Sequence, residues 1–323
     1  FNSDNLYLDI TKNYQGNINK ELATCTVEKE LDFHNELANL LSTFFKPTDE
    51  FPNLGVSANT YLDKTYDYII SSKLNSELKE KYSKLDNYLK EFYSIYDLPG
   101  FAIGVIKNDQ IVFAKGYGYQ DIEDKKPMTF KSTFHMASIS KTFTATAIMQ
   151  LHESGKLNID TPIVKYLPYF KLNDDRFKNL TARQLLNHTS GLADYRDDSK
   201  FEWNKPQHDD ETAERFVRNL NKRKLYKPVN NFAYSSISFD ILPDLIAKVS
   251  GLTFEEYMKN SILQPLEMEN STFFKNEVCA KLATQPYELE TDSYKYSPAK
   301  YYPYNRMCAG SGTLHSNVYE MFN

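Results

Sequence analysis

Residues 134–144 read Phe-His-Met-Ala-Ser-Ile-Ser-Lys-Thr-Phe-Thr, a stretch that contains a Ser-x-x-Lys element running from Ser138 to Lys141. Residues three apart share one face of a helix, so the Ser138 hydroxyl and the Lys141 amine can meet there. Such a pair is one way to activate a serine nucleophile without a histidine. The stretch therefore predicts a helix that begins near Ser138 and carries a candidate nucleophile with its base.

The Ser-x-x-Lys pattern occurs twice more, so its context has to separate the three matches. Residues 76–79 lie among charged residues, where the lysine is expected to stay solvated, and residues 297–300 contain a proline that disfavours a helix interior. Only Lys141 is followed by a long, weakly charged run, residues 142–151, which predicts a helix buried on most sides. Partial burial of Lys141 would favour its neutral, basic form.

Composition limits the class of protein. The 323 residues carry a net charge of −5, with 41% hydrophobic and 14% aromatic residues, which is typical of a folded globule of one or two domains. The chain has no basic stripe, which argues against a nucleic-acid partner. No apolar run approaches the roughly 18 residues of a transmembrane segment. No pattern indicates an oligomeric state.

Cysteines and histidines do not predict a metal site or another cofactor. The three cysteines, Cys25, Cys279 and Cys308, are too few and too scattered for a disulfide framework or a zinc site, although one pair could bridge in an oxidising compartment. The six histidines show no His-Glu-x-x-His spacing and are interpreted as structural or surface residues.

The chain divides into two parts by composition. Residues 1–72 are polar and irregular, with one expected helix at residues 36–45, and are interpreted as an N-terminal extension of unknown role. Residues 73–323 form the predicted domain. The chain begins at Phe1 rather than at a methionine, so we expect either a removed targeting segment or a fragment.

Periodicity in residues 73–323 predicts one hairpin among helices. A helix is expected at residues 75–93, then two strands at 101–107 and 110–117 around an Asn-Asp turn. The helix from Ser138 should end near Gly155, a favourable C-terminal cap, and Thr181 should cap a second helix. Further helical patterns cover residues 211–220, 236–250 and 253–263. The absence of βαβ alternation predicts an α+β fold, with helices packed against an antiparallel sheet.

Tyr234 is a candidate for a second proton-transfer group. It follows Ser138 by 96 residues, in the segment Asn-Phe-Ala-Tyr-Ser-Ser-Ile at 231–237, between small residues and just before a predicted helix. A phenol beside a cation such as Lys141 can transfer protons. Because the chain has 24 tyrosines, Tyr234 alone would be interpreted as structural.

Taken together, Ser138-x-x-Lys141 and Tyr234-Ser235-Ser236 resemble the serine β-lactamase and penicillin-binding-protein superfamily. The resemblance is greatest to the branch of class C β-lactamases, D-alanyl-D-alanine carboxypeptidases and family VIII esterases. Further segments match in order: Pro-Gly-Phe-Ala at 99–102, Gly-Lys-Leu at 155–157, Leu-Leu-Asn-His-Thr-Ser-Gly-Leu at 185–192 and Ala-Gly-Ser-Gly-Thr-Leu at 309–314. The likeness covers residues 76–323. It implies a β-lactamase/transpeptidase-like fold, with an antiparallel sheet flanked by helices and a mostly helical subdomain.

The resemblance also implies roles. Ser138 would attack a carbonyl to form an acyl-enzyme, Lys141 would accept the serine proton, and Tyr234 would relay a proton to the leaving group. The Ser138 backbone N–H would be one oxyanion donor. His188 lies in the 185–192 segment and is interpreted as structural; Ser190, Ser235 and Ser311 are interpreted as turn or cleft-lining residues. A small-molecule or peptide substrate, no cofactor, and a periplasmic, secreted or membrane-anchored location are implied as well.

Two departures from the family pattern limit what is expected. Ser236 stands where the second motif usually has a substrate-binding asparagine, and a hydroxyl offers one donor where an amide offers two. The third motif, a Lys-, His- or Trp-led x-Gly triplet, should follow residues 310–314 by some tens of residues, but the sequence ends at Asn323. Residues 315–317 lack its glycine and are not accepted as a substitute. We therefore expect the last strands and the second oxyanion donor to be missing from this chain.

Two functions follow from these expectations. The first is a serine hydrolase acting on an ester, a small peptide or a D-amino-acid amide, with Ser236 favouring esterase or peptidase activity over efficient β-lactam hydrolysis. The alternative is a catalytically silent, penicillin-binding-protein-like binding or regulatory protein. This alternative rests on Ser236 and on the unassigned residues 1–72.

Overall fold

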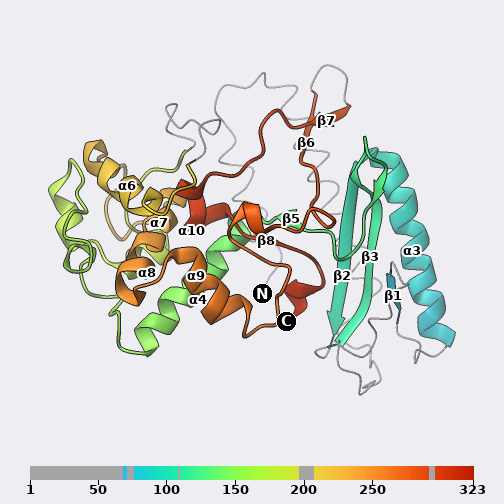
Figure 1. Ribbon diagram of the computed structural model, residues 1–323, viewed down its shortest axis with the longest axis horizontal. Helices are drawn as coiled ribbons and strands as arrows, with labels where there is room; N and C mark the ends of the chain where they lie inside the picture. Colours follow the sequence, from blue (N-terminus) through green and yellow to red (C-terminus); the bar gives the residue numbers. More distant parts are fainter. Residues whose placement is uncertain (1–67, 71–75, 108–109, 196–206, 291–294) are drawn as a thin grey trace.

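The computed structural model describes residues 68–70, 76–107, 110–195, 207–290 and 295–323. Helices and strands are mixed in these residues. A twisted antiparallel sheet with a long helix, α3, lies at one end of the molecule and a group of helices at the other (Figure 1). Short strands and the helix α10 lie between the two parts. The helix predicted at residues 36–45 lies outside the described residues.

The sheet is built around the predicted hairpin. Strands β2 (Gly100–Lys107) and β3 (Gln110–Asp121) pair antiparallel, with Lys107 opposite Gln110. The turn residues, 108–109, lie outside the described residues. Strand β1 (Tyr68–Ile70) pairs with the edge of β3 opposite β2, which gives the order β1-β3-β2. Strand β4 (Lys126–Pro127) pairs with the end of β3. The sheet thus includes residues before 73, while the division at residue 72 stays a prediction.

Helix α3 (Ser76–Tyr96) packs on one face of this sheet. Its buried side chains recur at helical spacing: Tyr82, Leu85, Leu89 and Phe92. The ring of Tyr82 stacks on that of Phe113 of β3, with centroids 6.1 Å apart. Strand β2 meets the C-terminal segment at Gly104, where an added Cβ would clash with Val318 and Phe322. A glycine at this position therefore lets residues 318–322, including the 3-10 helix η11 (Glu320–Phe322), lie against the strand.

The helical part has its own apolar core. Its helices are α4 (Ser140–Glu153), α5 (Ala182–Leu186), α6 (Thr212–Asn219), α7 (Ser236–Asp240), α8 (Leu242–Ser250), α9 (Phe254–Met258) and α10 (Ala309–Gly312). Short 3-10 helices are η3 (Ala137–Ile139), η4 (Ile163–Lys165), η5 (Asp175–Asn179), η7 (Leu220–Lys222), η9 (Lys275–Glu277) and η10 (Arg306–Cys308). Buried aliphatic and aromatic side chains from α4 to α9 form one contiguous cluster.

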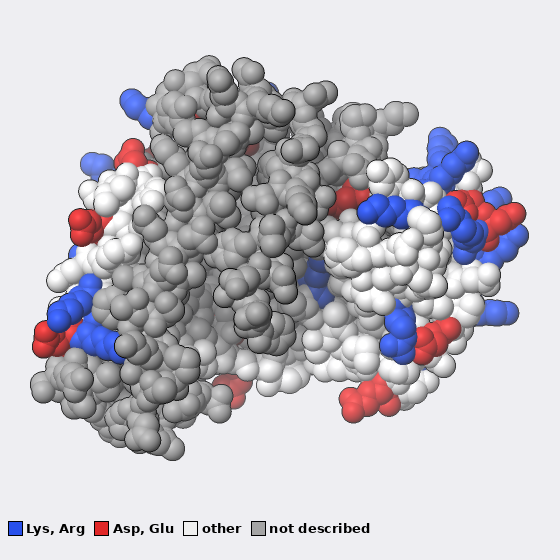
Figure 2. All heavy atoms as spheres, turned by 180° about the vertical axis from the view of Figure 1, so that it is seen from behind, with Lys and Arg blue, Asp and Glu red and all other residues white. Residues whose placement is uncertain are grey.

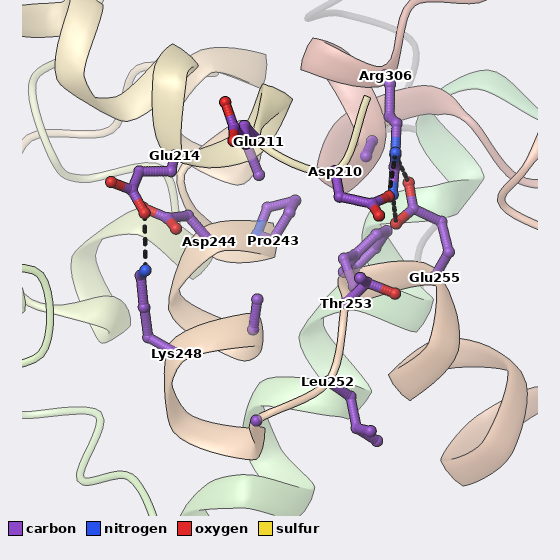
Figure 3. Close-up of a pocket in the computed structure, with 15 residues that line it drawn as sticks. Asp210, Glu211, Glu214, Pro243, Asp244, Lys248, Leu252, Thr253, Glu255 and Arg306 are labelled. Atoms are coloured by element: carbon purple, nitrogen blue, oxygen red, sulfur yellow. Dashed lines mark hydrogen bonds and ion pairs between the residues drawn. The ribbon is translucent and has the colours of Figure 1, made fainter. Parts of the chain in front are cut away.

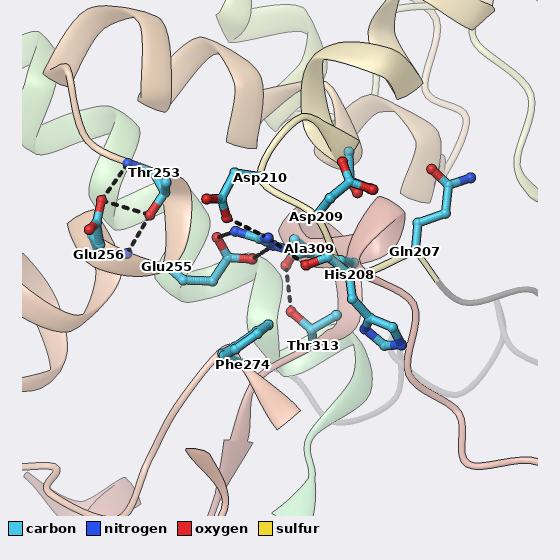
Figure 4. Close-up of polar contacts among 12 residues, drawn as sticks. Gln207, His208, Asp209, Asp210, Thr253, Glu255, Glu256, Phe274, Ala309 and Thr313 are labelled. Atoms are coloured by element: carbon cyan, nitrogen blue, oxygen red, sulfur yellow. Dashed lines mark hydrogen bonds and ion pairs between the residues drawn. The ribbon is translucent and has the colours of Figure 1, made fainter. Parts of the chain in front are cut away.

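Helix ends follow local chemistry. Thr181 caps α5 in a reciprocal capping box with Gln184, as its sequence predicts. Thr253 caps α9 in the same way with Glu256, and Figure 4 shows these bonds. Gly155 has φ +71° just after α4, the left-handed conformation that favours glycine.

Two predicted helices are interrupted. Residues 236–250 form α7 and α8, which meet at Ile241, and residues 253–263 form α9 followed by a π-helical turn, η8 (Lys259–Leu263). Pro243 explains the first break, because it has no N–H to continue the helical bonding from α7. Gly310 of α10 packs at this break, where a Cβ would clash with the Phe239 carbonyl and with Pro243.

The prediction that α4 is buried on most sides is confirmed, with one exception that the sequence did not show. The helix exposes one stripe, at Thr142, Thr146, Met149 and Glu153, the spacing of one helix face. The threonine hydroxyls donate to carbonyls of their own helix, Thr142 to Ile139 and Thr146 to Thr142. Because their own helix satisfies these hydroxyls, the two threonines can lie on the solvent side in place of charged residues. The sequence therefore showed no strongly polar helix face.

Short strands connect distant parts of the chain. β5 (Phe134–His135) pairs with β8 (His315–Ser316), and β6 (Tyr287–Leu289) pairs with β7 (Tyr296–Pro298). The β5–β8 pairing brings residues 309–316 next to the segment that carries Ser138. Of the other two Ser-x-x-Lys matches, residues 76–79 lie in α3, within a predicted helix. Ser297 lies in β7 and not in a helix, in agreement with the proline at 298.

The described surface gives no strong charge signal. On the face shown in Figure 2, the visible Lys and Arg side chains are interspersed with Asp and Glu. None of the described helices is both long enough and apolar enough to span a bilayer.

Candidate active site

Ser138 lies in η3, immediately before α4. The preceding residue, Ala137, has φ +43°, an uncommon backbone conformation for a residue with a side chain. Such conformations cost on the order of 1–3 kcal/mol and concentrate at functional sites. Ser138 is exposed, whereas Lys141 in the first turn of α4 is 7% exposed. The site thus combines an accessible hydroxyl with a buried amine.

Three predicted site residues meet at the Ser138 hydroxyl. Lys141 Nζ donates a hydrogen bond to Ser138 Oγ at 2.9 Å, and the Tyr234 hydroxyl donates one to the same oxygen at 2.9 Å. Lys141 Nζ also donates to the Ser311 carbonyl oxygen at 3.0 Å. The amine lies 5.1 Å from the centroid of the Tyr234 ring, a cation–π distance. Both proton-transfer candidates therefore contact the candidate nucleophile directly.

Tyr234 is held by the segment that precedes α7. Ser235 caps α7 through its hydroxyl, which accepts from the Ser238 N–H and donates to the Ala193 carbonyl. The Ser236 N–H donates to Asp194 Oδ1 at 2.8 Å. These bonds tie residues 234–236 to the loop at 188–194 and direct the tyrosine ring toward Ser138.

His188 supports the same segment. Its Nδ1 accepts from the Ser235 N–H at 3.2 Å, and its ring lies 4.5 Å from the Tyr234 ring between centroids. Burial, with a smaller effect of the Lys141 charge, lowers the pKa of His188 to about 4. The imidazole is then neutral at neutral pH, as an acceptor at Nδ1 requires. These contacts suit the structural role expected for His188.

A cavity of about 420 Å³ opens onto these groups. It is lined by His135, Ala137, Ser138, Lys141, Asp194, Tyr195, Tyr234, Ser236, Pro303, Asn305, Cys308, Ser311, Gly312 and Thr313. Ser236 is among the lining residues, where the family's asparagine was expected to contact substrate. Ser311 lines the cavity as predicted, whereas Ser190 is buried and bonds to Ser238 instead.

Residues 303–313 form one wall of this cavity, and Arg306 anchors that wall from behind. The guanidinium donates to both carboxylate oxygens of Glu255 at 2.6 and 2.9 Å. It also donates to Asp210 Oδ1 at 2.8 Å and to the His208 carbonyl at 2.9 Å. Figure 4 shows Asp210, Glu255 and His208 converging at this point. One arginine therefore joins the wall to α9 and to the chain before α6.

A second cavity of about 450 Å³ lies on the other side of the wall. Arg306 and Ala309 line it, whereas Asn305 and Cys308 line the first cavity. Its basic groups pair with acids, as Figure 3 shows for Lys248 with Glu214 and for Arg306 with Asp210 and Glu255. None of the predicted site residues lines it. We therefore place the candidate site in the first cavity.

Residue-by-residue reading of the sequence missed two carboxylates next to the site. Asp194 receives the Ser236 N–H, and Asp240 receives hydrogen bonds from Ser311. Asp240 had a recognisable signal, because it is one of two acidic residues, with Asp244, in the mostly apolar run at residues 237–246. Asp194 had none, since an acidic residue in a loop is ordinary.

The described residues contain no group of three or more His, Cys, Asp and Glu side chains placed to hold a metal ion. Cys279 and Cys308 are free thiols, the first exposed and the second buried. Cys25 lies outside the described residues.

Comparison with known proteins identifies the family. A family model described as Beta-lactamase matches residues 85–323, most of the chain. The chain belongs to the β-lactamase family. This confirms the predicted superfamily and the α+β, penicillin-binding-protein-like fold.

Two relatives show how much of a longer protein the chain matches. Protein Flp of Staphylococcus aureus (strain MRSA252) is 32% identical over 206 residues, 60% of this chain and 38% of that protein. The putative penicillin-binding protein PbpX of Bacillus subtilis (strain 168) is 28% identical over 270 residues, 82% of this chain and 63% of that protein. The chain thus spans between about a third and two thirds of these relatives.

Solved structures of β-lactamase-family proteins have the same fold. The octameric penicillin-binding protein homologue from Pyrococcus abyssi matches with a TM-score of 0.63 and 32% identity, over 75% of this chain and 55% of that chain. FmtA from Staphylococcus aureus matches with a TM-score of 0.63 and 26% identity, over 77% of this chain and 65% of that chain.

Proposed function

We propose that this β-lactamase-family protein is a serine hydrolase that forms an acyl-enzyme at Ser138. The observation that carries the proposal is the convergence of Lys141 Nζ and the Tyr234 hydroxyl on Ser138 Oγ, each at 2.9 Å. A nucleophile with its base at hydrogen-bond distance is the arrangement that nucleophilic catalysis needs. Lys141 is buried, and its amine lies within hydrogen-bond distance of the hydroxyl whose proton it would accept.

The reaction proceeds in two steps on these groups. Ser138 Oγ attacks the substrate carbonyl carbon while its proton passes to Lys141 Nζ. The C–O or C–N bond to the leaving group then breaks, and Tyr234 relays a proton to that group. Water attacks the acyl-enzyme, releases the carboxylic acid and returns a proton to Ser138 Oγ. Tyr234 lies against both Ser138 and Lys141, so it can take part in each proton transfer.

For the substrate, we propose an ester, a small peptide or a D-amino-acid amide rather than an efficiently hydrolysed β-lactam. Ser236 supports this ranking, because its short side chain lines the cavity where an asparagine amide would offer two donors. Fewer polar contacts to an amide side chain weaken recognition of substrates that depend on them. Ester substrates, with better leaving groups, depend less on such contacts.

Covalent labelling tests the proposal. The full-length protein is incubated with a fluorescent fluorophosphonate or β-lactam probe, and the labelled peptide is located by mass spectrometry. We expect the label on Ser138 and its loss in Ser138→Ala. A protein that takes up neither probe at Ser138 refutes the proposal. Turnover of p-nitrophenyl butyrate against nitrocefin tests the substrate ranking; fast nitrocefin hydrolysis with inert esters would reverse it.

The second candidate is a catalytically silent binding or regulatory protein. The altered second motif at Ser236 is the observation that favours it. A Ser138→Ala protein that keeps the full biological effect would support this candidate against the hydrolase. Loss of the effect together with loss of labelling would support the hydrolase.

A further inference from the structure

A fully buried carboxylate lies behind the candidate active site. Asp240 is the last residue of α7 and is 0% exposed. Its oxygens accept three hydrogen bonds: from the Ser311 N–H at 2.8 Å, the Ser311 hydroxyl at 3.0 Å and the Tyr195 hydroxyl at 2.8 Å. Two of the three donors thus belong to one residue of the cavity wall.

Ser311 connects this carboxylate to the proton-transfer groups. Its carbonyl oxygen accepts the hydrogen bond from Lys141 Nζ at 3.0 Å, and Lys141 Nζ donates its other bond to Ser138 Oγ. Holding both the N–H and the hydroxyl of Ser311 restricts its backbone and side-chain torsions. Those torsions set the direction of the carbonyl that faces Lys141. The contacts form one chain from Asp240 through Ser311 and Lys141 to Ser138.

Packing alone does not account for an acid at this position. The same wall is already tied to α4 by Thr144, whose hydroxyl donates to the Gly310 carbonyl at 2.8 Å, and by Ser140, whose hydroxyl accepts from the Leu314 N–H at 2.9 Å. Burial of a carboxylate is costly, and here it raises the pKa of Asp240 to about 7 despite the bonds from Tyr195 and Ser311. An apolar residue would pack there at lower cost, so the hydrogen bonds of this side chain to Ser311 and Tyr195 need an explanation beyond packing.

We propose that Asp240 is a positioning residue for the acylation step, which orients the Ser311 carbonyl and thereby holds Lys141 Nζ against Ser138 Oγ. The inference rests on the proposed function and extends it to a residue that touches neither substrate nor nucleophile. It predicts an effect on the rate of bond formation at Ser138 and not on the affinity of the noncovalent complex.

The test compares three variants of the full-length protein with the wild type. Asp240→Ala removes the two acceptor oxygens and with them all three hydrogen bonds. Asp240→Asn keeps the shape without the charge: its one oxygen can accept from the Ser311 N–H, and its NH2 can donate to the Tyr195 and Ser311 hydroxyls. Thr144→Val removes a hydrogen bond to the same wall that does not involve Lys141. For each, the concentration dependence of labelling by a fluorophosphonate separates the maximal labelling rate, kinact, from the affinity, KI. Melting temperatures are measured in parallel.

For Asp240→Ala we expect kinact to fall roughly 10- to 100-fold with KI nearly unchanged, because small displacements of a catalytic group reduce rates on that scale. Asp240→Asn should restore kinact to within a few-fold of the wild type. Thr144→Val should lower the melting temperature and leave kinact unchanged. If Asp240→Ala does not fold, Ser311→Ala decides, since it removes only the hydroxyl bond and should lower kinact by a smaller factor.

Several results would overturn the inference. The first is an unchanged kinact in Asp240→Ala or, where that variant does not fold, in Ser311→Ala. The second is an Asp240→Asn variant as slow as Asp240→Ala. The third is a loss of kinact in Thr144→Val equal to that in Asp240→Ala. A wild type that is not labelled at Ser138 refutes the proposed function and the inference with it. A labelled wild type with a fully active Asp240→Ala refutes the inference alone.

Discussion

Among single residues, Lys141 is the one on which the chemistry depends most. Ser-x-x-Lys spacing brings a serine and a lysine onto one helix face wherever it occurs, but the amine acts as a base only where water does not keep it charged. Lys141 is 7% exposed, and its amine contacts Ser138 Oγ and the Ser311 carbonyl, so it is placed to act on the serine proton.

Lys141→Ala should therefore lower the labelling rate at Ser138 by about 10²- to 10⁴-fold, the usual contribution of a positioned general base. Fluorophosphonate labelling measures it. Lys156→Ala is the matched control, because Lys156 is an exposed lysine just beyond the same helix and its removal should change nothing. Labelling of Lys141→Ala within threefold of the wild type would contradict the assignment.

Ser236 makes a prediction about substrate choice. Ser236→Asn would place the amide that the family resemblance leads us to expect on the cavity wall. One new hydrogen bond to a substrate amide is worth about 1 kcal/mol, so the ratio of nitrocefin to p-nitrophenyl butyrate kcat/KM should rise roughly fivefold. Ester turnover in the same variant serves as the internal control. A ratio that stays the same or falls would show that Ser236 does not set this preference.

At the scale of secondary-structure elements, the site depends on two breaks in regular structure. The interruption at Ile241 ends α7 at Asp240 and leaves room for α10, which approaches closely because residue 310 is a glycine. The tight packing of α10 carries Ser311 to Lys141. A continuous helix over residues 236–250 would leave no such room at this point.

The wall that carries α10 is anchored by Arg306, so Arg306→Ala should destabilise the protein strongly. Removing one partner of a buried ion pair costs roughly 3–5 kcal/mol, and the side chains of Arg306 and Glu255 are 9% and 13% exposed. Arg183→Ala is the control, since the Arg183–Asp160 pair is exposed and its loss should change stability little. Urea unfolding measures both, and equal losses would argue against the anchor.

For the whole molecule, we expect a loss of stability in acid, which arises from histidines buried between the sheet and the helical part. His135 of β5 and His315 of β8 lie opposite each other, and burial lowers the pKa of each to about 4. In the unfolded chain a histidine has a pKa near 6.5. Between pH 6.5 and 4 the unfolded state binds more protons, so the free energy of unfolding falls as the pH falls.

His135→Phe should remove part of this dependence. At about 1.4 kcal/mol per pKa unit, we expect the variant to lose about 2 kcal/mol less than the wild type between pH 7.5 and pH 5. The comparison must be made between the two proteins, because other groups titrate over the same range. The raised pKa of Asp240, for example, increases the free energy of unfolding as the pH falls. Urea unfolding at both pH values measures the difference. Parallel losses in the two proteins would contradict the prediction.

The elements that could be predicted are those set by neighbouring residues. The β2–β3 hairpin, the Thr181 cap and the glycine after α4 all appeared where local signals placed them. Strand β1 did not, because it forms only by pairing with β3, more than 40 residues further along the chain. The break at Ile241 was missed although Pro243 is a local signal for it. The acidic Asp240 was visible in an apolar segment, but its role was not, because its partners lie 45 and 71 residues away in the chain.

The sequence by itself determined the pairing of Ser138 with Lys141, since three residues along a helix always bring two side chains together. Its ordered motifs also determined the family. Only the tertiary structure decided that Tyr234, 96 residues on, and Ser311, 170 residues from Lys141, complete the same site. The reason is physical: backbone geometry sets short spacings, whereas long-range contacts form only when apolar cores bury and fix the segments that carry them.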